Sequence, residues 1–299
     1  MNRVAQHPVK AFAGALAAVG VLSVMDALMK SLVIALGIFA VSIWRSLANF
    51  LLSAVLYLPR RQPWPTVPTL RIHIARSVTV TVMAGLFFWG IGRVPLAQGI
   101  ALTFIAPLIA MLLASMFLNE TVGSRSILGA VLAFAGVLVI VLGQAGAQLG
   151  PKVLVGSVAI VGSALCYAVN IVLMRRQALA ARPLEINFFQ SLTVLLLWLA
   201  VIPLVGAPAA PHGYAGWIIV ASLMSTAGGL LFAWAYARGE ASYLAVSEYS
   251  AFLWASALGW LVFRERVSLY TLAGAALIVG GCLIAARRKA EPPEIDLAA

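Results

Sequence analysis

The amino-acid sequence predicts an all-α membrane protein with ten transmembrane helices, arranged as two inverted five-helix repeats around a central cavity. Three observations lead to this prediction: the composition of the chain, its apolar runs and a duplication of its sequence. The 299 residues are 63% hydrophobic and only 10% charged, and the mean hydropathy is +1.03. A soluble domain of this length exposes far more charge, so we expect the chain to lie in a membrane.

The second half of the chain repeats the first at a spacing of 145 residues. Matches between Leu or Ala residues arise easily in apolar sequence, but matches between Trp, Arg or Glu residues do not. Such matches occur in one register without a gap: Trp89 with Trp234, Arg93 with Arg238, Glu120 with Glu265 and Gly129 with Gly274. We therefore predict a first repeat over residues 1–145, a second over residues 146–288 and a disordered cytoplasmic tail over residues 289–299.

Each repeat supplies five apolar runs that are long enough, or nearly so, to cross a hydrocarbon core, which needs about 20 helical residues. The first run begins at Ala11 and is too long for the core of a signal peptide, so we interpret it as a spanning helix. The connections are short and leave no room between the runs for a separate soluble domain. In chain order, the predicted spans are 11–33, 37–58, 75–92, 95–117, 126–143, 153–174, 184–204, 215–237, 241–262 and 269–286.

The distribution of Lys and Arg predicts the orientation of these spans. With the N-terminus in the cytoplasm, the inside segments carry fourteen of these residues and the outside segments carry five. Because cytoplasmic loops are enriched in Lys and Arg, we expect both termini on the cytoplasmic side of a cell inner membrane. Five helices per repeat is an odd number, so the second repeat enters the membrane upside down. Inverted repeats are typical of secondary transporters, in which one repeat rocks against the other around a site near the midplane.

The formal net charge of +11 and the pI near 10.4 would indicate a nucleic-acid partner if the protein were soluble. Here the basic residues lie between apolar runs, so we assign them to topology and to contact with anionic lipid headgroups, and expect no nucleic acid. Cys166 and Cys282 lie within apolar runs, where we expect no disulfide. A ten-helix chain can enclose its own cavity, which favours a monomer.

A membrane-embedded enzyme is the alternative from another class. His7, His73 and His212 fall in predicted loops or termini, and the chain has no HExxH or other paired metal-binding motif. It also has no GxxxxGK phosphate loop, so we do not expect it to hydrolyse ATP. The sequence thus predicts no enzyme, no cofactor and no bound metal. A channel is harder to exclude, and saturable counterflow would distinguish a carrier from it.

Several short segments resemble the drug/metabolite transporter superfamily, and specifically its ten-helix EamA-type members. The segments that carry the resemblance, in order, are Asp26 to Lys30, Trp44 to Leu47, Pro107, Phe117 to Glu120 followed by Gly129, Glu248 with Tyr249, and Phe263 to Glu265 followed by Gly274. The resemblance implies inverted five-helix repeats around a central cavity and outward transport of amino acids or related metabolites. YddG-type exporters of aromatic amino acids have the nearest described function. One departure is Phe252, which stands where the first repeat has Pro107, so a kink there is in doubt.

The duplication also divides the polar residues into two groups. Those present in both repeats are expected to serve the fold, and those present once to serve a substrate, since substrates are rarely symmetric. Glu120 and Glu265 lie in tight turns before Thr or Ser cap candidates, where a carboxylate stabilises a helix N-terminus. Arg93 and Arg238 lie at helix ends and are expected to extend to the membrane surface.

Asp26 and Arg45 occur in the first repeat only, each at membrane depth. Both lie about 12 Å below the outer surface at 1.5 Å per residue, so they could form an ion pair. Such a pair could be structural, or Arg45 could hold a substrate carboxylate while Asp26 completes its network. Lys30, one turn beyond Asp26, is an alternative partner for that carboxylate.

Glu248 is the strongest functional candidate, because it is the one charge in the predicted span 241–262 and Tyr249 follows it directly. Burial favours the neutral form of a carboxyl group. Glu248 could accept the ammonium group of an amino acid or carry the proton that drives export. The alternative is a protonated side chain that is hydrogen-bonded to a neighbouring helix.

Aromatic rings with a few amides and hydroxyls suit an amphipathic small molecule. Trp89 and Trp234 are duplicated, which favours a packing role for them. The sequence predicts a secondary transporter that exports aromatic or other small amphipathic amino acids, or related metabolites, by alternating access; the alternative is uptake of another small metabolite. The further candidates for the cavity wall are Trp89, Gln98, Thr103, Tyr167, Asn170 and Trp234.

Overall fold

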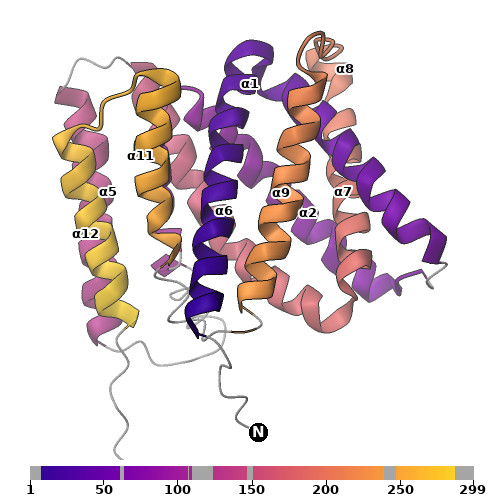
Figure 1. Ribbon diagram of the computed structural model, residues 1–299, viewed down its shortest axis with the longest axis horizontal. Helices are drawn as coiled ribbons and strands as arrows, with labels where there is room; N and C mark the ends of the chain where they lie inside the picture. Colours follow the sequence, from indigo (N-terminus) through magenta and orange to yellow (C-terminus); the bar gives the residue numbers. More distant parts are fainter. Residues whose placement is uncertain are drawn as a thin grey trace, which may run out of the picture.

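The computed structural model describes residues 8–60, 64–106, 108–109, 124–146, 151–236, 238 and 247–286 of the chain. Within these ranges the secondary structure is helical and contains no β-strand. Figure 1 shows the helices standing side by side as a bundle. We call the end at which helix α1 begins in Figure 1 the lower end, and the opposite end the upper end.

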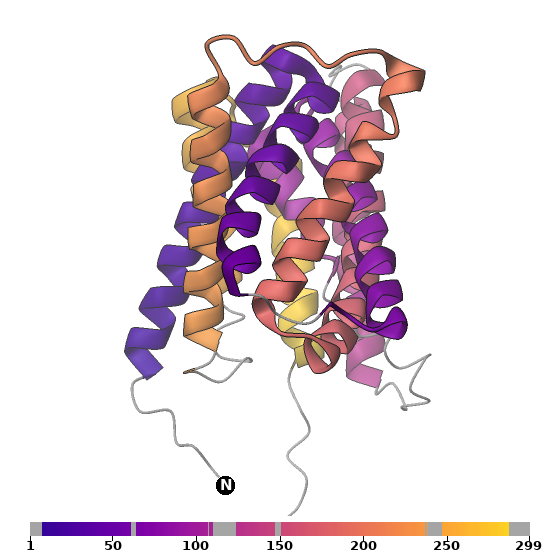
Figure 2. The same ribbon diagram turned by 90° about the vertical axis from the view of Figure 1, so that its right-hand side faces the viewer.

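Helix α1 (Pro8–Tyr57) consists of two limbs that join at Gly37. The φ of Gly37 is 79° and its ψ is 156°, a conformation that residues with a Cβ atom rarely adopt. The first limb rises to the upper end, and the second descends from it to the side of the bundle (Figures 1 and 2). The two limbs correspond to the first two predicted spans.

The other helices complete the bundle. In chain order they are η1 (Leu58–Arg60), α2 (Val67–Ile91), α3 (Leu96–Thr103), α5 (Ser124–Gly146), α6 (Pro151–Ala180), α7 (Pro183–Leu199), α8 (Ile202–Val205), α9 (Ala215–Tyr236), α11 (Ser250–Phe263) and α12 (Leu269–Ala286). The most extensive packing joins α1 to α9, α2 to α6, and α5 to α12.

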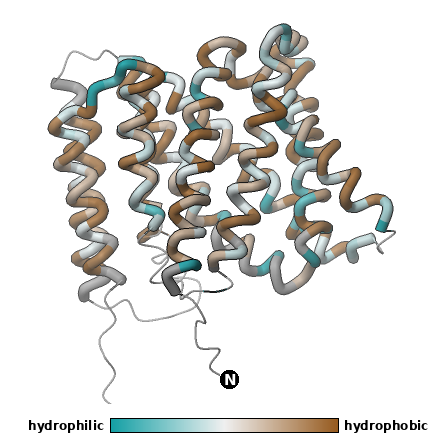
Figure 3. Tube along the Cα trace, in the orientation of Figure 1, coloured by the Kyte–Doolittle hydropathy of each residue, from teal (hydrophilic) through white to brown (hydrophobic). Residues whose placement is uncertain are grey.

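Five helical segments among the described residues are long and apolar enough to cross a membrane, and the segment Lys10–Arg60 contains both limbs of α1. Large apolar side chains are exposed on the surface of the bundle, such as Val55 (72%) and Leu230 (68%). Figure 3 shows hydrophobic residues along the whole length of the helices. Lipid covers apolar surface of this extent, so the chain is a multi-pass membrane protein. The predicted spans 95–117 and 241–262 are described only in part, as α3 and α11, so the count of ten stays a prediction.

One expectation is wrong. His73 does not lie in a loop, because α2 begins at Val67 rather than at the predicted residue 75. Its imidazole is completely buried, and it hydrogen-bonds to Gln177 on α6 and to Glu185 on α7. Since these partners satisfy the polar side chain inside the bundle, the helix continues through a stretch that is too polar to be recognised as a span.

Helix α3 ends at Thr103, and α11 begins only after Tyr249. The regular helical hydrogen bonding is therefore interrupted at Phe104 and at Tyr249, which are related by the 145-residue repeat. No proline accompanies the second interruption, while Pro107 lies outside the described residues. The rings of Phe104 and Tyr249 meet edge to face, with their centroids 5.3 Å apart.

Two glycine contacts between α5 and α12 are related by the 145-residue repeat. A Cβ atom added to Gly136 would lie 2.6 Å from the carbonyl oxygen of Gly274, and one added to Gly281 would collide with the carbonyl oxygen of Gly129. Gly274 and Gly281 are the repeat counterparts of Gly129 and Gly136, so equivalent positions exchange partners. A two-fold relation between the repeats would produce such an exchange, and glycine lets the two backbones approach closely.

A buried ion pair closes the upper end of the bundle. Lys30 on α1 pairs with the Oε1 atom of Glu265, which lies in the loop before α12, and donates a second hydrogen bond of 2.6 Å to the carbonyl oxygen of Val94. The other carboxylate oxygen of Glu265 accepts the N–H of Leu96 at the start of α3, at 2.8 Å. The Nζ atom of Lys30 also lies 4.9 Å from the centre of the Phe263 ring. Glu265 therefore lies at a helix N-terminus as expected, but the helix is α3 and not α12.

Replacement of Gly274 by Ala should destabilise the protein. The new methyl group would lie 2.6 Å from the carbonyl oxygen of Gly136, and overpacking of this kind costs about 1–3 kcal/mol. The matched control is Gly280→Ala on the same helix, where nothing lies within 4 Å of the added Cβ. Thermal unfolding of the purified protein should show a lower melting temperature for Gly274→Ala alone. Equal melting temperatures for the two variants would contradict this close packing.

The ion pair should show strong coupling in a double-mutant cycle. Lys30→Met or Glu265→Gln alone leaves one buried group without its partner, and each loss is expected to cost about 3–5 kcal/mol. The double variant should cost less than the sum of the two single variants, because neither group is then left uncompensated. Thermal unfolding in the same detergent measures all four proteins. Additive effects would mean that the two side chains do not interact.

Candidate functional site

The turn at Gly37 brings Asp26 and Arg45 from the two limbs of α1 into electrostatic contact. They do not form a direct ion pair, since no Arg45 nitrogen lies within 4 Å of an Asp26 oxygen. Instead the Arg45 guanidinium lies over the Phe88 ring, 5.2 Å from its centre, and its Nε atom is buried without a hydrogen-bond partner. Lys30, the alternative partner of Asp26, pairs with Glu265.

Both Asp26 and Arg45 lie deep inside the bundle, yet each side chain is only half-buried. Ionisable groups at such a depth usually face a cavity or a partner.

Glu248 and Tyr167 come together from the second half of the chain. Glu248 is half-buried immediately before α11, and it acts electrostatically on the Tyr167 hydroxyl of α6. Tyr167 lies deep in the bundle but is 40% exposed. A carboxyl group and a phenol that lie together can bind a cationic or hydrogen-bonding group of a small molecule.

The residues on either side of Glu248 line a groove of about 510 Å³ between α1, α11 and α12. Ser247, Tyr249 and Ser250 supply its polar edge, and its other walls are apolar, with Phe12 and Leu16 from α1 among them. A volume of this size is within the range of small-molecule sites. Tyr249 thus contributes to this groove as well as packing against Phe104.

Three other predicted cavity residues are engaged in contacts within the bundle. Asn170 on α6 is buried and accepts a 3.0 Å hydrogen bond from the Nε of Arg76 on α2. Gln98 is also buried and donates to the Ser157 hydroxyl at 2.9 Å, which ties α3 to α6. The Thr103 hydroxyl donates to the carbonyl oxygen of Ile100 within its own helix.

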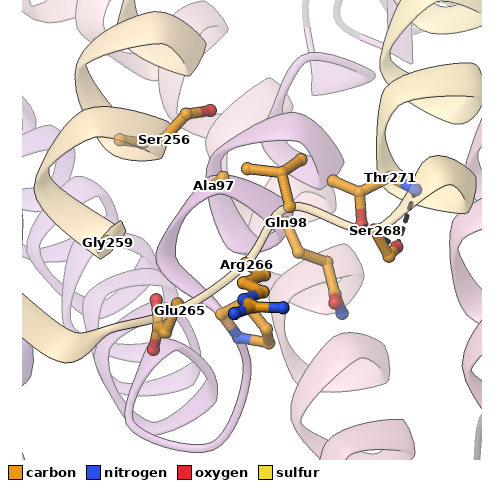
Figure 4. Close-up of a pocket in the computed structure, with 11 residues that line it drawn as sticks. Ala97, Gln98, Ser256, Gly259, Glu265, Arg266, Ser268 and Thr271 are labelled. Atoms are coloured by element: carbon orange, nitrogen blue, oxygen red, sulfur yellow. Dashed lines mark hydrogen bonds between the residues drawn. The ribbon is translucent and has the colours of Figure 1, made fainter.

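A second pocket, of about 250 Å³, lies at the upper end between α3, α11 and α12 (Figure 4). Gln98, Glu265 and Arg266 line it, and none of the other predicted site residues is among the residues described around it. Ser268 caps α12 at one side of this pocket, where its hydroxyl accepts the N–H of Thr271 at 3.1 Å. The pocket therefore adjoins the ion pair that closes the upper end, and lies apart from Glu248.

Trp89 and Trp234 form the same local arrangement in the two halves of the chain. The guanidinium of Arg93 lies 3.6 Å from the centre of the Trp89 ring, and that of Arg238 lies 4.6 Å from the centre of the Trp234 ring. Each arginine also donates to the backbone oxygen of the same tryptophan. Repetition of these pairs near helix ends favours a structural role for both tryptophans.

The structure also assembles a polar network that sequence reasoning missed. Arg76, His73, Gln177 and Glu185 join α2, α6 and α7 through hydrogen bonds between their side chains. The three-residue spacing of His73 and Arg76, which places them on one helix face, was the available signal. Across the described residues, no three His, Cys, Asp or Glu side chains lie together as metal ligands would.

Comparison with known proteins identifies the family. The sequence model of the EamA-like transporter family matches the chain twice, at residues 9–142 and 154–287. Pseudopaline exporter CntI from two strains of Pseudomonas aeruginosa is 26% identical over 280 residues, which are 89% of this chain and 92% of the exporter.

One solved crystal structure, described only as that of a protein, has a similar fold. Its TM-score is 0.61 at 23% sequence identity, and the match covers 94% of this chain and 100% of the other. The two family matches together span most of the sequence, on either side of the short segment that connects them. The chain therefore belongs to the EamA-like transporter family of the drug/metabolite transporter superfamily.

Proposed function

We propose that this protein is a secondary transporter that exports small amphipathic metabolites, aromatic amino acids among them, across the inner membrane by alternating access. The observation that carries the proposal is the set of side chains that lie deep in the bundle but keep accessible surface. Asp26 and Arg45 come from the first family match, and Tyr167 and Glu248 from the second. A space bordered by both halves is where a transporter of this kind binds its cargo.

The chemistry of these groups suits a zwitterion. Arg45 is half-buried and has no direct carboxylate partner, so its guanidinium can bind a carboxylate of the cargo, with Asp26 as a more distant counter-charge. Glu248 can accept an ammonium group or carry a proton, and the Tyr167 hydroxyl beside it can complete the contact. Tyr249 and the groove next to it supply the apolar surface that an aromatic or aliphatic side chain requires.

Alternating access requires two arrangements of the same bundle. The reciprocal glycine contacts between α5 and α12, and the meeting of Phe104 with Tyr249, support inverted repeats over residues 1–145 and 146–288. The Lys and Arg count supports a cytoplasmic lower end. In that orientation the Lys30–Glu265 pair closes the external side, and it has to open when cargo is released there.

The direction of transport rests on the relatives. Two proteins that match 89% of this chain are exporters, which supports export here too. We propose that one chain encloses the complete pathway, so that the protein acts as a monomer with lipid as its surrounding partner.

Counterflow in proteoliposomes tests the proposal. Vesicles preloaded with unlabelled phenylalanine, leucine, glutamate or lysine should take up the same labelled amino acid by accelerated and saturable exchange for one of these groups. Uptake that neither saturates nor accelerates would indicate a channel. No exchange by any of them, in protein with a normal thermal unfolding transition, would remove the amino-acid assignment.

Replacement of Glu248 by Gln should slow exchange and flatten its dependence on pH. A hydrogen bond to a charged group contributes about 1.5–3 kcal/mol, so a loss of roughly tenfold or more is expected. The control is Glu294→Gln, which makes the same chemical change in the C-terminal tail. Wild-type exchange rates at every pH in the Glu248→Gln protein would exclude a role for this carboxyl group in binding or coupling.

A further inference from the structure

Arg76 is a charged side chain at membrane depth to which neither the sequence prediction nor the family assigns a function. It lies nine residues along α2 from Val67, about 14 Å from the lower end of the helix. Its Nε donates to Asn170 at 3.0 Å, and its Nη1 donates to the Oε1 of Gln177. Both acceptors are buried on α6, so the guanidinium is held in one position.

The positive charge of Arg76 has no direct counter-ion in the part of the chain that the structure describes, where no carboxylate lies within 4 Å of it. A guanidinium has five N–H donors, and the two hydrogen bonds to α6 leave three of them. Arg76 is only half-buried, and none of its nitrogen atoms is sealed off without a partner. The remaining donors are therefore open to a ligand.

Because a guanidinium can only donate, the direction of each hydrogen bond from Arg76 through Gln177 and His73 to Glu185 is determined. Since Arg76 can only donate, Gln177 must present its oxygen to Arg76 and its amide N–H to the Nδ1 of His73, at 2.5 Å. His73 then accepts at Nδ1 and donates from Nε2 to the Oε1 of Glu185, at 3.3 Å. The His73 ring also stacks on Phe189, with centroids 5.4 Å apart. Every bond in this chain points from Arg76 toward Glu185.

The guanidinium of Arg76 and the carboxylate of Glu185 lie at the two ends of this hydrogen-bond relay. Two completely buried side chains, Gln177 and His73, separate them. A direct ion pair would have occupied the guanidinium, whereas the relay leaves its open side free for another anion. Buried polar side chains such as Gln177 and His73 are stable only if they are hydrogen-bonded, and the relay provides these bonds.

The open side of Arg76 adjoins the proposed cargo space. Asn170 follows Tyr167 by three residues on α6, so the two side chains lie on the same face of that helix. Arg76 therefore contacts α6 at Asn170, about one helical turn along that helix from Tyr167, whose hydroxyl interacts with Glu248. Arg45 lies eight residues from the turn at Gly37, nearer the upper end.

We propose that Arg76 is a second anion subsite of the transport pathway, which binds a carboxylate group of the cargo on the lower side of Tyr167. Gln177, His73 and Glu185 are positioning residues, which hold the guanidinium of Arg76 in place. The identity of the cargo rests on the proposed function, but the presence of the subsite can be tested without it. In this arrangement Arg45 and Arg76 bind carboxylates at two depths.

Chemical modification of the full-length protein in lipid nanodiscs tests the subsite. Phenylglyoxal reacts with accessible guanidinium groups, and peptide mass spectrometry follows Arg76 and, on the same helix, the exposed Arg71. Benzoate should slow the labelling of Arg76, by roughly tenfold at nine times its dissociation constant, while its uncharged analogue benzamide should not. Labelling of Arg71 should be unaffected by either compound.

Two results would overturn the subsite. The first is an Arg76 that stays unlabelled while Arg71 reacts, which would make it a purely structural group. The second is an Arg76 whose labelling is changed equally by benzoate and benzamide, or by neither. These outcomes do not depend on amino-acid exchange, so failure of the subsite and failure of the proposed function can be told apart.

A substitution at Gln177 tests the positioning relay. Gln177→Glu places a carboxylate against Arg76, so the internal anion should slow labelling and abolish the protection by benzoate. If the wild-type protein exchanges an amino acid, Arg76→Gln should raise its KM much more than it lowers kcat, while Arg71→Gln should leave both unchanged. Protection by benzoate that is unaltered in Gln177→Glu would show that Gln177 does not position Arg76.

Discussion

The carboxylate of Glu265 holds together three segments that are far apart in the chain. Its two oxygens bind Lys30 on the first limb of α1 and the N–H of Leu96 at the start of α3, while Glu265 itself precedes α12. In surroundings of low dielectric, neither charge can be left alone without a large cost. The position of α3 follows from this junction, and with it the contact of Gln98 with Ser157 on α6. The upper end of the bundle depends on one ion pair.

The charged groups lower in the bundle are arranged differently. Arg45 has a buried Nε without a partner and only a distant carboxylate in Asp26, and Arg76 is held by the neutral side chains of Asn170 and Gln177 rather than by a carboxylate. A direct carboxylate partner occupies a cation, whereas a cation that is held by neutral groups can still bind an anion.

The duplication places equivalent contacts in the two halves of the chain. Gly136 meets Gly274, and their repeat counterparts Gly281 and Gly129 meet in the same way, because glycine allows backbone contact at both places. The Arg–Trp pairs at Trp89 and Trp234 are repeated as well. Asp26, Arg45, Arg76 and Glu248 have no charged counterpart at the equivalent position of the other repeat. The repeated residues thus form the scaffold, and the charged residues that occur once are added to it.

The sequence by itself determined that the protein is a helical membrane transporter with a duplicated chain, because apolar length and repeat register are local properties that can be read along the chain. It also predicted that Asp26 and Arg45 interact. Only the tertiary structure decided the partners of the other polar groups. Lys30 pairs with Glu265, which is 235 residues away in the sequence. His73 can lie in the interior because Gln177 and Glu185 form hydrogen bonds with its two ring nitrogens. Hydropathy cannot distinguish a polar loop from a helix whose polar side chains are paired inside a bundle, since the pairing depends on how distant helices pack.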